Sequence, residues 1–97
     1  MSTIQLNAGD FERASRLFKN SRERCVTLEA NIKNNTENLL SSWQGESKKA
    51  FEKEYRTLEK GMSNYKDLLT EIADELSKIS TTFTEADETI RRSLSGN

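Results

Sequence analysis

The side chains most often used in catalysis are scarce or badly spaced in this chain of 97 residues. It has no histidine, and Cys25 is its one cysteine, so neither a histidine base nor a zinc site of thiolates and imidazoles can be assembled. Glu52 and Glu54 stand two positions apart and would point in different directions on a helix. We therefore predict that the protein is not an enzyme and binds no metal or cofactor.

Charge and hydropathy argue against nucleic acid and membranes as partners. Fifteen basic and sixteen acidic residues give a formal net charge of −1, and no block is rich in lysine or arginine. The start lacks a basic stretch followed by an apolar run, and no apolar run reaches the ~18 residues needed to cross a bilayer. We expect no nucleic-acid partner, no membrane contact and no general secretory signal.

A regular hydrophobic rhythm runs through the second half of the chain. Apolar residues recur there in alternating steps of four and three, which is typical of a helix with a narrow, coiled-coil-like stripe. Within this span only Leu68 and Ala73 are apolar outside the stripe. The stripe consists of Phe51, Tyr55, Leu58, Met62, Tyr65, Leu69, Ile72, Leu76, Ile79, Phe83, Ala86 and Ile90.

The first half repeats this rhythm more weakly, because polar Ser21 and Asn35 take two of its positions. We call the two sets the apolar stripes and predict that they form the helix-packing and dimer seam. Cys25 lies on the first stripe, so we expect it to serve as a small core residue. The apolar members of the first stripe are Phe11, Ala14, Phe18, Cys25, Leu28, Ile32 and Leu39.

Capping signals and one break divide the chain into two helices. Asn7 and Asp10 have the spacing of a capping pair, which places the first helix at about residues 8–40. Gly45 is the glycine in a turn-like context, which places the second helix at about residues 46–93. A break this short predicts antiparallel neighbours.

The predicted fold is therefore an all-α, antiparallel two-helix hairpin. It forms a single domain over residues 1–97, with a short N-terminal arm at 1–7 and a frayed C-terminal tail at about 94–97. At 1.5 Å per residue the helices span about 50 Å and about 70 Å. The C-terminal end of the second helix should therefore overhang the first.

The outward faces carry acidic and basic residues four positions apart, in the order that favours pairing within a helix. Examples are Glu29 with Lys33 and Glu52 with Arg56. We interpret these faces as solvated and expect their ion pairs to form within each helix.

The break itself has a distinctive sequence, Trp43-Gln44-Gly45, near the middle of a chain of about one hundred residues. It stands between two amphipathic helices, and Phe51 begins the second stripe. In this combination the chain resembles the WXG-motif family of small type VII secretion substrates. The similarity covers the whole chain, with Trp43 and Gly45 as its turn motif.

The resemblance implies a secreted or secretion-associated protein of Gram-positive type that dimerises into a four-helix bundle. The partner would be a second copy, which we favour, or a related WXG-type subunit. Export would follow a leaderless route after a cytoplasmic pool, through a type VII secretion ATPase.

Family members also carry an export element, Tyr-x-x-x-Asp/Glu, late in the second helix. The comparable place here holds Phe83 and Asp87, with phenylalanine instead of tyrosine. Tyr55 and Glu59 fit the letters better but lie next to the turn, which makes them the weaker candidate. Core packing also accounts for Phe83, and covering the helix ends also accounts for Trp43.

The turn and the export-like element cannot meet within one chain. Forty residues separate Trp43 from Phe83, which corresponds to about 60 Å of helix. If two hairpins associate head to tail, Trp43 of one copy approaches Phe83 and Asp87 of the other, and symmetry creates two such composite sites.

The leading functional hypothesis is a small type VII substrate that is exported as a folded dimer and acts by protein binding. One alternative is an adaptor for a larger exported toxin, docking beside the toxin's helical targeting domain. A membrane-active effector and a purely structural coiled coil are the remaining alternatives, although the mixed charge opposite the stripe argues against the membrane.

Overall fold

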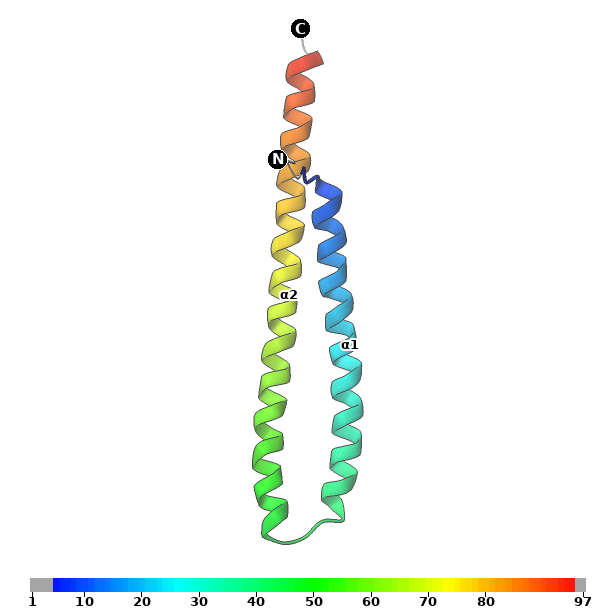
Figure 1. The fold of residues 1–97 in the computed structure, drawn as a ribbon, viewed down its shortest axis with the longest axis vertical. Helices are drawn as coiled ribbons and strands as arrows, with labels where there is room; N and C mark the ends of the chain where they lie inside the picture. Colours follow the sequence, from blue (N-terminus) through cyan, green and yellow to red (C-terminus); the bar gives the residue numbers. More distant parts are fainter. Residues whose placement is uncertain (1–4, 96–97) are drawn as a thin grey trace.

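Two helices make up nearly all of the part of the chain that the structure describes, residues 5–95. In this computed structural model, α1 spans Ala8–Ser41 and α2 spans Glu46–Ser95. They lie side by side and antiparallel, and residues 42–45 connect them (Figure 1). The predicted all-α hairpin is confirmed, with observed helix ends one and two residues later than expected.

The start of α1 is a capping box. The Asn7 backbone N–H donates to Asp10 Oδ2 at 2.9 Å, and the Asp10 N–H donates to Asn7 Oδ1 at 3.1 Å. These reciprocal bonds satisfy amides that have no partner inside the helix. The predicted cap is therefore confirmed.

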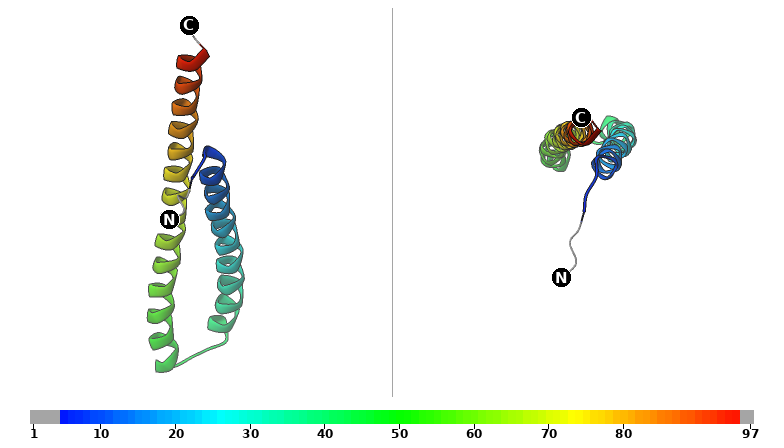
Figure 2. Two further views of the ribbon diagram at one scale, coloured as in Figure 1. Left: turned by 45° about the horizontal axis from the view of Figure 1, so that its top comes forward. Right: turned by 90° about the horizontal axis from the view of Figure 1, so that it is seen from above.

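The outer ends of the hairpin are of unequal length. Residues 84–95 of α2 extend past the start of α1, as the left view of Figure 2 shows. All of these residues are exposed. Leu94 and Ser95, which were predicted to lie in the tail, are the last residues of α2. Residues 96–97 of that tail, and residues 1–4 of the predicted N-terminal arm, lie outside the described residues.

The hairpin is long and thin, measuring 80 × 28 × 15 Å. Its radius of gyration is 22.2 Å, compared with about 13 Å for a compact domain of this length. Such a shape leaves room for only a thin core. The buried apolar residues in the described part are Leu40, Tyr55, Leu69 and Ala73.

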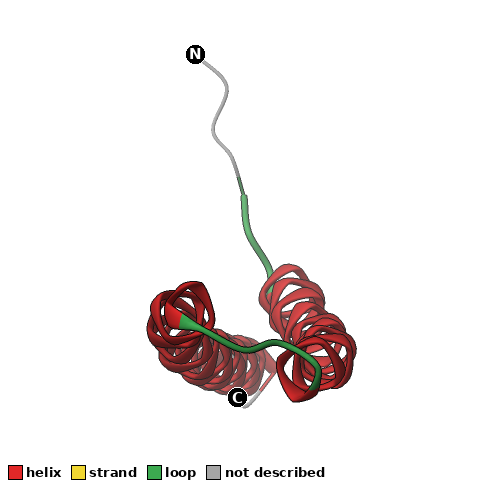
Figure 3. Ribbon diagram, turned by 90° about the horizontal axis from the view of Figure 1, so that it is seen from below, coloured by secondary structure: helices red, strands yellow, loops and turns green. Residues whose placement is uncertain are grey.

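Two hydrogen bonds from side chain to backbone join the helices near the start of α1. The buried Ser15 hydroxyl donates to the Ala73 carbonyl at 2.8 Å, and the Ser80 hydroxyl donates to the Ala8 carbonyl at 3.0 Å. Side chains this small let the backbones approach. At the opposite end, residues 42–45 bridge the helix ends, as the view onto the turn shows (Figure 3).

None of the helices in the described part is long and apolar enough to cross a membrane.

Candidate interaction surface

The two apolar stripes do not face each other squarely across the hairpin. Within the stripe of α2, Tyr55 and Leu69 are buried between the helices. Leu58 and Tyr65 turn to one side and remain 49% and 54% exposed. Leu28 on α1 behaves in the same way, with 58% exposed. Each stripe is thus shared between the hairpin contact and one open face.

The contact between the helices has a second edge, away from the open face. The residues buried along that edge each follow a stripe residue directly in the sequence, at what we call the shifted positions. Leu40, one position after the stripe, is 5% exposed, whereas the stripe residue Leu39 is 54% exposed. Apart from Leu40, every second shifted position is buried or half-buried, and the shifted positions in between, such as Ser63, are exposed. The residues at the buried and half-buried positions are mostly small or polar. They are Ser15, Arg22, Glu29, Thr36, Glu52, Glu59, Lys66, Ala73 and Ser80.

An apolar groove lies along the open face to which the stripes turn. It encloses about 260 Å³ near the middle of the hairpin, between α1 and α2. Cys25, predicted to be a core residue, is half-buried and forms part of its wall. The lining residues are Cys25, Leu28, Leu58, Gly61, Met62 and Tyr65. We call this the central groove.

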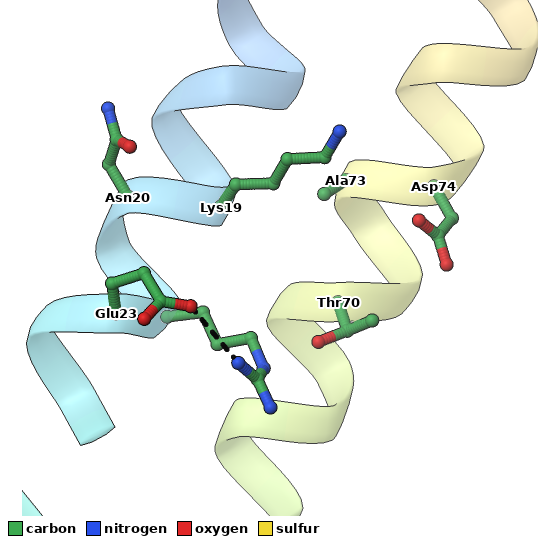
Figure 4. Close-up of a pocket in the computed structure, with 7 residues that line it drawn as sticks. Lys19, Asn20, Glu23, Thr70, Ala73 and Asp74 are labelled. Atoms are coloured by element: carbon green, nitrogen blue, oxygen red, sulfur yellow. Dashed lines mark hydrogen bonds and ion pairs between the residues drawn. The ribbon is translucent and has the colours of Figure 1, made fainter.

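The other face of the hairpin is polar. A hollow there is lined by Lys19, Asn20, Glu23, Thr70, Ala73 and Asp74, together with Arg22 (Figure 4). Arg22 and Glu23 form an ion pair at 3.2 Å within it. The two faces therefore differ in chemistry, because the half-exposed apolar residues Leu28, Leu58 and Tyr65 line the central groove and not this hollow.

Two expected ion pairs have other partners in the fold. Glu29 pairs with Lys66 across the hairpin, with Nζ 2.8 Å from Oε2, instead of with Lys33. Arg56 lies 3.5 Å from Glu37 on α1 and 2.7 Å from Glu59 on its own helix, instead of pairing with Glu52. Both pairings were wrong: the partner of Glu29 lies across the hairpin, whereas the nearest carboxylate to Arg56 belongs to Glu59 on its own helix.

At the turn, Trp43 lies over the first turns of α2. Its ring centroid is 5.3 Å from that of Phe51, and its indole Nε1 donates to Ser47 Oγ at 3.3 Å. Phe51 in turn stacks on Tyr55, with centroids 6.3 Å apart. Gly45 has φ +108°, which only glycine adopts without strain. In the turn motif, Trp43 therefore covers the start of α2, and Gly45 supplies the backbone conformation that the turn needs.

At the far end, the export-like element is split between a packed and an exposed residue. The Phe83 ring packs on Phe11 with centroids 4.7 Å apart, whereas Asp87 is exposed on the overhang of α2. Trp43 lies at the opposite end of the hairpin from both (Figure 1). A single chain does not bring the two elements together.

The weaker candidate, Tyr55 with Glu59, lies inside the hairpin. Tyr55 is 3% exposed, and its hydroxyl has no hydrogen-bond partner among the described residues. Burial, helped by nearby Glu59 and Glu37, raises the pKa of this hydroxyl above its ordinary value of 10.0. Glu59 is held by Arg56. A partner would have to open the hairpin to contact Tyr55.

The sequence of the chain matches a known family over residues 3–88. That family is WXG100, described as proteins of 100 residues with WXG. The chain belongs to the WXG100 family. WXG100 proteins are non-enzymatic proteins secreted by type VII systems, and they typically form homodimers or heterodimers. The prediction of a non-enzymatic type VII substrate is thereby confirmed.

Solved structures share the hairpin. A secreted protein ESXB from Bacillus anthracis matches with a TM-score of 0.79 and 23% identity, over 90% of this chain and 99% of that one. EsxA of Geobacillus thermodenitrificans matches with a TM-score of 0.78 and 22% identity, over 93% and 97% of the two chains. These likenesses establish the fold. No curated protein matches the sequence significantly.

Sequence reasoning missed the small residues that join the helices near the start of α1. Ser15, Ala73 and Ser80 are buried, yet none lies on a stripe. Each follows a stripe residue directly, but so do exposed residues such as Lys19 and Ser63, so this position alone did not reveal them. Small residues at that place permit the rotation that turns the stripes toward the open face.

Proposed function

We propose that this WXG100 protein leaves the cell as a folded dimer of two hairpins and acts by binding other proteins. The observation that carries the proposal is the half-exposed apolar face. Leu28, Leu58 and Tyr65 are about half exposed in the single chain, although they belong to a heptad-like stripe. In a four-helix bundle such stripes point toward the bundle centre, between the hairpins.

The amount of exposed surface supports a partner of similar size. The chain exposes 7830 Å², whereas a compact monomer of 11.1 kDa would expose about 5,700 Å². The excess of about 2,000 Å² per chain falls in the range that one partner contributes to a large obligate interface. A second copy of the chain presents the same apolar face and therefore fits this role.

A head-to-tail arrangement would complete the recognition elements. Trp43 at the turn of one copy would lie near Phe83 and Asp87 of the other, and the two-fold symmetry would create two equal sites. A type VII secretion ATPase that reads both elements together would accept the dimer and reject the monomer. Export by the type VII route would draw on a cytoplasmic pool of assembled dimers.

An export assay in the native host, combined with light scattering of the purified chain, tests this function. We expect about twice the 11.1 kDa mass of one chain in solution. Leu58→Asp should yield monomers that stay in the cell, because a charge would be buried between the hairpins. Glu54→Gln, an exposed change on the same helix, is the control. Normal export of a monomeric Leu58→Asp chain would refute the proposal.

A second candidate function, an adaptor for a larger exported toxin, is favoured by the overhang of α2. Residues 84–95 have no α1 beside them, and Ile90 and Leu94 are 58% and 84% exposed. A helical targeting domain could cover this segment. Co-purification from the native host separates the two functions: recovery mainly with a large protein supports the adaptor, and recovery mainly with itself supports the substrate.

A further inference from the structure

Gly61 lies in the middle of α2, and the hairpin by itself gives no structural reason for a glycine at this position. Glycine is among the least favourable residues in a helix interior. Gly45 needs glycine for its positive φ, but Gly61 has ordinary helical geometry. A Cβ built on Gly61 meets no atom within 4 Å, so packing inside the hairpin does not require glycine either.

Because Gly61 has no side chain, it leaves a space on the apolar face of α2. Gly61 forms part of the central groove, between Leu58 and Tyr65 on the same helix. Both neighbours are about half exposed, whereas Gly61 offers no side chain at all. The result is a hole between two knobs on an apolar face, which is the pattern that packed helices use to interlock.

The position of Gly61 along α2 points to a second copy as the occupant. In a head-to-tail pair the two α2 helices overlap most fully when the two-fold axis lies near the middle of the part of α2 that has α1 beside it, residues 46–83, and residue 63 lies there. An axis at residue 63 sets Gly61 against Tyr65 of the other copy, because these two residues are centred on 63.

The same register also pairs two further exposed apolar residues. Leu58 falls opposite Leu68 of the other copy, since they too are centred on residue 63. Leu58 is 49% and Leu68 is 51% exposed in the single chain. Leu68 lies outside the stripe and is half exposed, and this pairing would cover it.

We propose that Gly61 is the hole that receives Tyr65 of a second copy, and that this pair sets the register of the α2 helices across the two-fold axis. The proposal rests on the dimer proposed above and adds the residues that fix its alignment. Two such contacts form per dimer, one on each side of the axis. A side chain at position 61 would occupy the space that the tyrosine ring needs.

Gly61→Leu in the full-length chain tests this assignment. We expect the dimer to dissociate about 10-fold to 100-fold more readily, as measured by sedimentation over a range of concentrations, because the leucine overfills the contact. Helix content by circular dichroism should not fall. Ser63→Leu is the matched control, since residue 63 lies on the opposite side of the same turn and is exposed. That variant should dimerise like the unaltered chain.

A compensating variant tests the pairing itself. Adding Tyr65→Ala to Gly61→Leu makes room for the leucine, and we expect it to recover most of the lost affinity. Failure to recover, or a Gly61→Leu dimer as tight as that of Ser63→Leu, would overturn the assignment while leaving the dimer in place. A monomeric unaltered chain would instead overturn the dimer, and the proposed function with it.

Discussion

The ring of Phe83 packs on the ring of Phe11, with the two centroids 4.7 Å apart and the planes tilted by 52°. This contact joins the aromatic residue of the export-like element to the first turns of α1. It makes Phe83 part of the hairpin as well as part of any recognition surface. Asp87, one turn later, is exposed and makes no comparable contact.

Substitutions at these two residues should therefore separate stability from export. Phe83→Ala should lower the free energy of unfolding by about 2 kcal/mol, less than a fully buried phenylalanine would. Asp87→Ala should leave stability unchanged but reduce export, measured as the secreted fraction in the native host. Glu85→Ala, also exposed on the overhang, is the control. Equal export of both acidic variants would argue against a recognition role for Asp87.

Two adjacent leucines should differ sharply in their contribution to the hairpin. Leu40→Ala should cost about 2–4 kcal/mol, because the side chain is 5% exposed and its loss leaves a cavity. Leu39→Ala, at 54% exposure, should cost less than half as much in dilute solution. Urea titrations of both variants measure the difference. A larger loss for Leu39→Ala would mean that the stripe itself, and not the shifted line, forms the hairpin contact.

The buried hydroxyl of Tyr55 should make stability depend on high pH. Its folded-state pKa is raised above 10.0, so the folded chain holds this proton more tightly than the unfolded chain does. The stabilisation that comes from the protonated hydroxyl is fully present below pH 10, and it is lost as the pH rises through the folded-state pKa. Tyr55→Phe should weaken this loss, measured as the free energy of unfolding from pH 8 upward.

At neutral pH the same variant has a second expected effect. Because the Tyr55 hydroxyl has no hydrogen-bond partner among the described residues, Tyr55→Phe should be neutral or stabilising by up to about 1 kcal/mol. A clear destabilisation would show that the hydroxyl has a bonded partner in solution.

Gly45 should tolerate substitution poorly for a backbone reason. Gly45→Ala forces an L side chain into φ +108°, which should cost about 1–2 kcal/mol. Gln44→Ala changes an exposed neighbour in the same turn and should be nearly neutral. Thermal unfolding of the two variants provides the comparison. Equal stability of both would mean that the turn relaxes to another conformation.

Much of the architecture follows from the sequence because its signals are local. The capping pair Asn7 and Asp10 locates the start of α1, and Gly45 locates the break between the helices to within one residue. The short break requires an antiparallel hairpin, and the unequal helix lengths require the overhang. Trp43-Gln44-Gly45 in that setting indicates the family, which the match over residues 3–88 confirms.

The direction in which each stripe points was decided only by the tertiary structure. Spacing shows which residues share one side of a helix, but it does not show how far that helix rotates toward its neighbour. Here the small residues Ser15 and Ala73 bring the backbones close, and Glu29 reaches Lys66 across the contact. That rotation buries Leu40 and turns Leu58 and Tyr65 outward, because a helix–helix contact is set by both surfaces together.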